Sequence, residues 1–140
     1  MRGLIVVFVL VFGLNVYSQT AVLKNFRIED SNKNRVYFDS SEPISGSGTS
    51  GFYISGKTIS GVNIVSGSTS GHYFSVSSPF TFWDNNTIRY EGGSGLQSEN
   101  GKKLNEFTLQ YVKNNIPEPT STGSTYYVST VGNNSNSGLS

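Results

Sequence analysis

Residue types that carry acid–base, nucleophilic and metal chemistry are scarce in this sequence. His72 is the only histidine and cysteine is absent, which excludes two-histidine metal sites, thiolate metal sites and cysteine nucleophiles. Because His72 ends a polar turn, we expect a solvated turn residue there and not a catalytic base. Asp39 and Glu42 are the nearest pair for glycosidase chemistry, but their neighbours are polar and nothing apolar surrounds them to raise a pKa. We therefore predict no catalytic residue and no bound cofactor in this chain.

Aromatic side chains offer a second kind of chemistry, which is stacking on sugar rings. Alternation places Phe80 and Phe82 on one face, and Trp83 on the other with Thr81. An exposed Trp83 near tyrosines such as Tyr73 would suit the C–H-rich faces of a glycan. Alternatively, Trp83 closes the open end of a hydrophobic core. The sequence favours the core lid, because a lone Trp usually buries most of its area, and keeps Trp83 and Tyr73 as candidate glycan contacts.

Carboxylates could also bind calcium together with backbone oxygens, as they do in many extracellular modules. The candidates are Asp30, Asp39, Glu42 and Glu99. No Asp-x-Asp-x-Asp spacing supports such a site. Ten Lys and Arg nearly balance nine Asp and Glu, and they form no basic stripe, so nucleic acid is not an expected partner.

The N-terminus has the pattern of an export signal. Arg2 precedes an apolar run over 3–14, and a small residue, Ser18, ends the segment. The run is shorter than the roughly 20 residues of a membrane span. We predict a secretory signal peptide at 1–18, cleaved after Ser18, and a secreted or cell-surface protein without a membrane segment after cleavage; a retained anchor is the alternative.

Residues 19–116 show the period-2 alternation of β-strands and no sustained helical period. The predicted inward pairs are Val36 and Phe38, Phe52 and Ile54, Val62 and Ile64, Phe74 and Val76, and Ile88 and Tyr90. A last strand is expected at 107–112, and the Gly-rich stretches 45–51 and 92–95 are expected to be loops. About seven short strands separated by turn formers predict an all-β, Ig-like antiparallel β-sandwich.

The composition changes after this domain. Residues 117–124 contain two prolines followed by small polar residues, which is typical of a linker. A new strand is expected at 125–129, and a strand of that length cannot bury itself. We therefore predict that residues 125–140 are the start of a second, truncated domain.

Two parts of the chain, within 36–116 and within 126–138, resemble known families. Residues 36–116 resemble the SwmB-like Ig-like repeats of bacterial surface proteins, through strand and turn motifs at 36–44, at 84–90 and at 95–104, the last followed by Phe107 and 112–115. Residues 126–129 (Tyr-Tyr-Val-Ser) and 132–138 (Gly-Asn-Asn-Ser-Asn-Ser-Gly) resemble the entry segment of secreted right-handed parallel β-helix proteins. That resemblance implies a parent protein that acts on glycans, such as a polysaccharide lyase, with catalytic residues on later coils.

These observations lead to a functional prediction. We expect a non-catalytic secreted Ig-like module that spaces or orients its own C-terminal β-helix domain. The alternatives are a carbohydrate-binding module that uses Trp83 to bind a polysaccharide, and a cell-surface adhesion repeat. A free-standing enzyme is not expected, because the chain offers no complete catalytic constellation.

Overall fold

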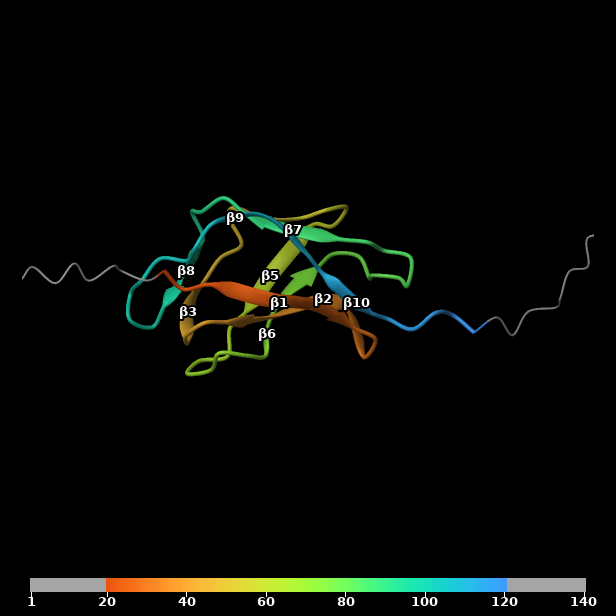
Figure 1. The fold of residues 1–140 in the computed structure, drawn as a ribbon, viewed down its shortest axis with the longest axis horizontal. Coiled ribbons are helices and arrows are strands. Elements are labelled where there is room, and N and C mark those ends of the chain that lie inside the picture. Colours follow the sequence, from red (N-terminus) through yellow and green to blue (C-terminus); the bar gives the residue numbers. More distant parts are fainter. Residues whose placement is uncertain (1–19, 121–140) are drawn as a thin grey trace, which may run out of the picture.

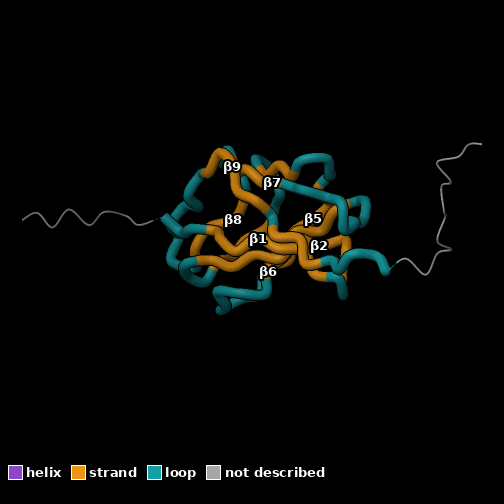
Figure 2. The backbone as a smooth tube through the Cα atoms, turned by 45° about the vertical axis from the view of Figure 1, so that its right-hand side comes forward, coloured by secondary structure: helices purple, strands orange, loops and turns teal. Residues whose placement is uncertain are grey.

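The computed structural model describes residues 20–120, which form an all-β sandwich without a helix in that range (Figures 1 and 2). No helix in this part of the chain could span a membrane. The strands are β1 (Leu23–Glu29), β2 (Asn32–Ser40), β3 (Ile44–Ser47), β4 (Phe52–Ile54), β5 (Ile59–Asn63), β6 (His72–Val76), β7 (Thr87–Tyr90), β8 (Gly95–Ser98), β9 (Phe107–Tyr111) and β10 (Lys113–Asn115). The predicted signal peptide at 1–18 and the predicted β-helix entry at 125–140 lie outside the described residues.

The strands form three sheets. The largest has the order β10-β1-β2-β6-β5, and the other two are β4-β7-β9 and β3-β8. Apolar side chains from all three sheets meet in one hydrophobic core. The large sheet is therefore one layer of the sandwich, and the two smaller sheets make up the other.

Aromatic rings connect the two layers. Phe38 stacks on Phe74 within the large sheet, with ring centroids 4.7 Å apart. Phe74 contacts Phe52 of β4 at 4.7 Å, and Phe52 stacks on Tyr90 of β7 at 4.1 Å. Rings at these separations gain pair energy in addition to the burial of their area.

Four of the five predicted inward pairs are buried: those at 36 and 38, 52 and 54, 74 and 76, and 88 and 90. The fifth pair, Val62 and Ile64, is only partly buried and packs against the edge of the core. β5, which carries Val62, is the edge strand of the large sheet, and this explains the weaker burial.

The prediction of loops at 45–51 and 92–95 is wrong in part, because β3 and β8 pair there. Glycine permits this pairing. A Cβ atom on Gly46 would collide with the carbonyl oxygen of Gly95, and a Cβ on Gly95 would collide with that of Ser47. Glycine has a low strand propensity, so these stretches are typical of loops in the sequence. In the structure they form paired strands, because the two backbones approach too closely at these positions for any side chain.

β1 contains a bulge that interrupts its alternation. Its buried residues are Leu23, Phe26 and Ile28, so the spacing is three residues and then two. The register with β2 shifts at this point, and Asn25 has a positive φ of 57°. The extra residue turns the side chain of Asn25 toward Asp39, to whose Oδ2 its Nδ2 donates at 2.9 Å.

The last strand, β10, pairs in parallel with the first, β1, through Arg27 and Lys113, Ile28 and Asn114, and Glu29 and Asn115. The described chain begins at one end of the long axis and leaves at the other (Figure 1). The predicted linker at 117–124 is described as far as residue 120, and residues 117–120 are exposed and outside any strand.

Substitution of Phe38 tests whether the stability of the fold depends on its aromatic core. Phe38 is fully buried. We expect Phe38→Ala to lower the free energy of unfolding by about 3–5 kcal/mol, because the change removes a ring and leaves a cavity. The exposed Val65 provides the control, and Val65→Ala should change stability by less than about 0.5 kcal/mol. Denaturant unfolding followed by circular dichroism measures both. Equal, small effects would contradict the proposed core.

Candidate functional site

His72 is buried in β6, so the prediction of a solvated turn residue is wrong. Its side chain has no exposed area, and its ring lies 5.4 Å from that of Phe38. The backbone N–H of Val65 donates to Nδ1 at 3.1 Å. The hydroxyl of Ser40 donates to the carbonyl oxygen of Glu42, which leaves Ser40 Oγ as an acceptor for His72 Nε2, 3.4 Å away. Both ring nitrogens therefore have partners in the neutral form, and His72 is a structural residue.

Burial lowers the pKa of His72 below its ordinary value of 6.5, and the nearby charge of Asp39 opposes this shift only in part. A buried imidazole resists protonation because its charged form loses hydration. Protonation would also place a hydrogen on Nδ1, where the N–H of Val65 now donates. The neutral ring therefore stabilises the fold.

Asp39 and Glu42, the pair considered for glycosidase chemistry, have separate partners. Asp39 accepts from Asn25 and lies 3.4 Å from Nη1 of Arg27. Glu42 lies 3.4 Å from Nζ of Lys102. The two carboxylates are each paired with a different cation.

The remaining carboxylates considered for calcium also have separate partners. Asp30 lies 3.0 Å from Nζ of Lys33, and Glu99 accepts from the backbone N–H of Gly67 at 2.7 Å. Within residues 20–120 no group of three or more His, Cys, Asp or Glu side chains could hold a metal ion.

Trp83 is 75% exposed, so the prediction that it closes the core is wrong. Phe80, three residues earlier, is buried in the core in its place. The ring of Trp83 packs edge-on against that of Phe82, with centroids 4.8 Å apart. Its indole is therefore available to solvent at a tight turn.

Two side chains hold the turn that carries Trp83. The carboxamide of Asn114 donates to the carbonyl oxygens of Thr81, Phe82 and Asp84 at 2.8, 3.3 and 3.0 Å. The carboxylate of Asp84 accepts from the N–H of Thr81 at 2.7 Å and lies 3.4 Å from Nζ of Lys57. An exposed Trp on a backbone fixed in this way loses little conformational freedom when it binds a ligand.

Tyr73 lies elsewhere, on the outward face of the large sheet. It is half-buried and contacts the ring of Tyr37 at 5.7 Å. The guanidinium carbon of Arg35 lies 4.1 Å from the centre of its ring. Among residues 20–120 no ring contact joins Tyr73 to Trp83, so the two predicted glycan contacts do not form one platform.

The strand register aligns a row of side chains across this face. The row runs from β10 to β5 and consists of Lys113, Arg27, Tyr37, Tyr73 and Asn63. Of these five residues, only Tyr73 is a candidate from the sequence. The others were missed because a cross-strand row depends on pairing, which the spacing within one strand does not reveal.

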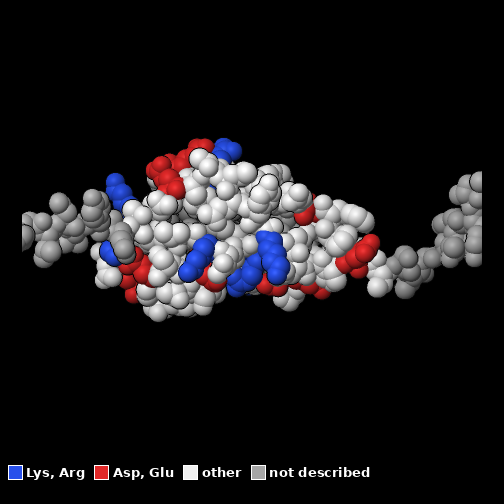
Figure 3. Space-filling model, in the orientation of Figure 1, with Lys and Arg blue, Asp and Glu red and all other residues white. Residues whose placement is uncertain are grey.

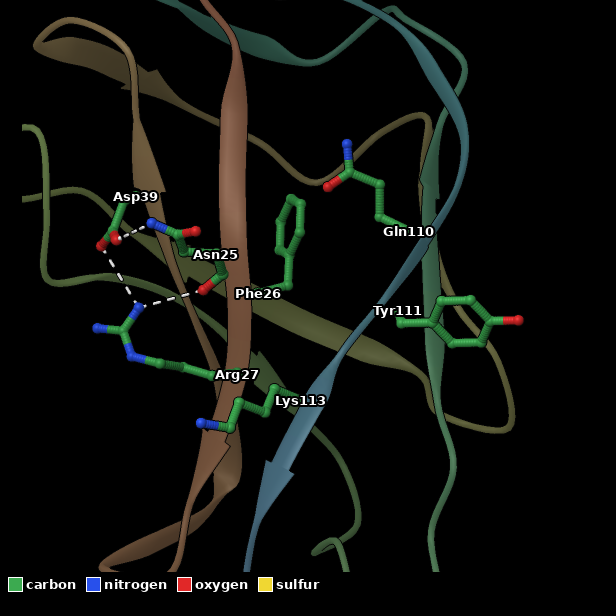
Figure 4. Close-up of a pocket in the computed structure, with 7 residues that line it drawn as sticks. All are labelled: Asn25, Phe26, Arg27, Asp39, Gln110, Tyr111 and Lys113. Carbon is green, nitrogen blue, oxygen red and sulfur yellow. Dashed lines mark hydrogen bonds and ion pairs between the residues drawn. The ribbon is translucent and has the colours of Figure 1, made fainter.

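A groove of about 510 Å³ lies beside this row, where β1 separates from the chain that enters β10. Its walls are formed by Asn25, Phe26, Arg27, Asp39, Gln110, Tyr111 and Lys113. Figure 4 shows Phe26 and Gln110 pointing into the gap between the strands, whereas Tyr111 points away from it. Lys113 extends across β1 toward Arg27, so the groove opens beside the cationic end of the row.

Hydrogen bonds fix the polar wall of this groove (Figure 4). Nη1 of Arg27 donates to the carbonyl oxygen of Asn25 at 3.1 Å and lies 3.4 Å from Oδ1 of Asp39. Nε of Arg27 lies 3.2 Å from Glu29. This network holds the β1 bulge and uses much of the hydrogen-bonding capacity of Arg27.

Comparisons with protein-family models, curated proteins and solved structures find no match to this chain.

The buried histidine predicts a pH dependence of stability. As the pH falls below 6.5, the ordinary pKa of the unfolded residue, the unfolded chain binds a proton that the folded chain excludes. The free energy of unfolding should therefore decrease from about pH 7 to about pH 5, by no more than about 1.4 kcal/mol per pH unit. The control is His72→Asn, whose amide oxygen can accept from Val65 but does not titrate in this range. We expect a flatter profile for this variant in denaturant unfolding, and equal slopes would contradict the assignment.

Proposed function

We propose that residues 20–116 are a non-catalytic extracellular accessory module that spaces or orients the domain that follows it. The observation that carries this proposal is the path of the chain, which enters and leaves at opposite ends of the long axis (Figure 1). A module with this arrangement adds its own length between whatever precedes it and whatever follows it.

The contacts of the exit segment support an orienting role. Ile116 is buried, and its N–H donates to Oδ1 of Asn114 at 3.1 Å. A groove beyond it is lined by residues 79–82 and 116–120 together with Asp30 and Lys33. The folded domain therefore holds the chain as far as Ile116, and the exposed residues that follow begin from a fixed point.

The nature of the following domain rests on resemblance. The motif at 126–138 resembles the entry of a secreted right-handed β-helix, and in such proteins the catalytic groups lie on later coils. We propose that the parent protein acts on glycans, with a polysaccharide lyase as the leading candidate, and that the module described here takes no part in the chemistry.

Deleting the module from the longer protein tests its spacing role. We expect deletion of residues 20–116 to preserve the activity of the following domain on a soluble substrate, because the module supplies no catalytic group. Small-angle X-ray scattering should show a maximum dimension reduced by about the length of one domain. Loss of activity on the soluble substrate would contradict a non-catalytic role.

One observation favours a second candidate function, which is carbohydrate binding. The exposed indole of Trp83 on its fixed turn has the geometry of a stacking contact for a sugar ring.

Affinity electrophoresis through gels that contain neutral polysaccharides tests this candidate. We expect Trp83→Ala to remove retardation by any polysaccharide that binds through this residue. Stability should change by less than about 0.5 kcal/mol, because the side chain is exposed. Tyr53→Ala is the matched control, since Tyr53 is an exposed aromatic residue on β4. Retardation that persists in Trp83→Ala would exclude this residue as the platform.

A further inference from the structure

We infer that the outward face of the large sheet binds an anionic polysaccharide through Arg35 and Lys113. This surface is distinct from the turn of Trp83, and the inference goes beyond both functions proposed above. It rests on the charges, the aromatic pair and the extended row of side chains that crosses the five strands.

The charges on this face are unevenly paired. Figure 3 shows several Lys and Arg side chains over the region of β1, β2 and β10, with Asp and Glu side chains beside some of them. Arg27 is committed to Asp39 and Glu29. Within residues 20–120, by contrast, neither Arg35 nor Lys113 has a carboxylate at ion-pair distance. These two cations are free to bind an external anion.

Arg35 is held in an orientation suited to anion binding. Its guanidinium carbon lies 4.1 Å from the centre of the Tyr73 ring, which is a close cation–π contact. Stacking and a side-chain hydrogen bond with Tyr37 restrain the guanidinium, and its remaining N–H groups are available as donors. A restrained fork of this kind suits the paired oxygens of a carboxylate or a sulfate.

The tyrosines and the amide supply contacts of another kind. Tyr37 and Tyr73 form a cross-strand pair at the middle of the row, and Asn63 continues it to the edge strand. Hydroxyl and amide groups can exchange hydrogen bonds with sugar hydroxyls, and the exposed ring surface can contact sugar C–H groups.

The dimensions of the surface favour a polymer over a small anion. Five strands at spacings of about 4.8 Å make a row about 19 Å long. The face is that of an open sheet, and the groove beside Lys113 extends it toward Gln110. Lys113 and Arg35 lie on strands that are separated by β1, so a linear glycan with repeated acidic groups can engage both of them.

Binding is tested with the full chain, without its predicted signal, against three polymers. Polygalacturonate supplies carboxylates, dextran sulfate supplies sulfates, and dextran is neutral. We expect affinity electrophoresis and isothermal titration calorimetry to show binding to at least one of the two anionic polymers. Dextran should bind less tightly than that polymer or not at all. Raising NaCl from about 50 mM to about 500 mM should weaken the binding, because exposed charges are screened.

Substitutions locate the site. We expect the double variant Arg35→Gln and Lys113→Gln to weaken binding by about tenfold or more, because each change removes a charge-assisted hydrogen bond. Lys103→Gln is the matched control: it removes an exposed lysine without an ion-pair partner in the described chain, located outside this sheet. Tyr73→Phe should retain binding, since it keeps the ring beneath Arg35.

The outcomes are distinct. Equal binding to dextran, no binding to either anionic polymer, or an equal loss in Lys103→Gln would each overturn the inference. So would a dimer that persists in the absence of polymer and buries this face. If Trp83→Ala lost binding while the double variant kept it, the binding site would lie at the turn of Trp83 and the inference would be wrong. None of these results bears on the spacing role, because none of the substitutions alters residues 116–120, through which the chain leaves the domain.

Discussion

The whole structure depends on the contact between aromatic rings across the two layers of the sandwich. Phe38 and Phe74 project from the large sheet, and Phe52 and Tyr90 project from the smaller sheet opposite. Cysteine is absent from the sequence, so no disulfide supports this contact. The packing of these rings fixes the distance between the layers and leaves the outward faces free to carry polar, charged and exposed aromatic side chains.

Alternation within single strands was sufficient to predict most of this core. It placed Phe38, Phe74 and Tyr90 correctly, because one face of each strand is buried. The same alternation, extended by one step from Phe74, would have placed His72 inside as well; its position after a polar turn obscured this. Alternation fails where the chain departs from period 2, as at the bulge of Asn25, and where glycine permits close pairing, as at Gly46.

The candidate binding surfaces were less predictable, for a physical reason. Trp83 was identified from its type, but its exposure depends on Phe80 taking the buried position in the same segment. Tyr73 was identified without its neighbours. Arg35 and Lys113 come from distant parts of the sequence, and the pairing of β2 with β6 and of β10 with β1 brings them to the same face. Only the register of the sheet reveals such a surface.

The parallel pairing of β1 with β10 has a mechanical consequence. The first and last strands lie side by side and run in the same direction, while the chain enters and leaves at opposite poles. Tension applied through the two ends would load their hydrogen bonds along the strands, so that these bonds must yield together rather than one after another. Forced unfolding is governed by the unfolding barrier. A domain with this arrangement can transmit a pull from one end of the chain to the other without opening from one end.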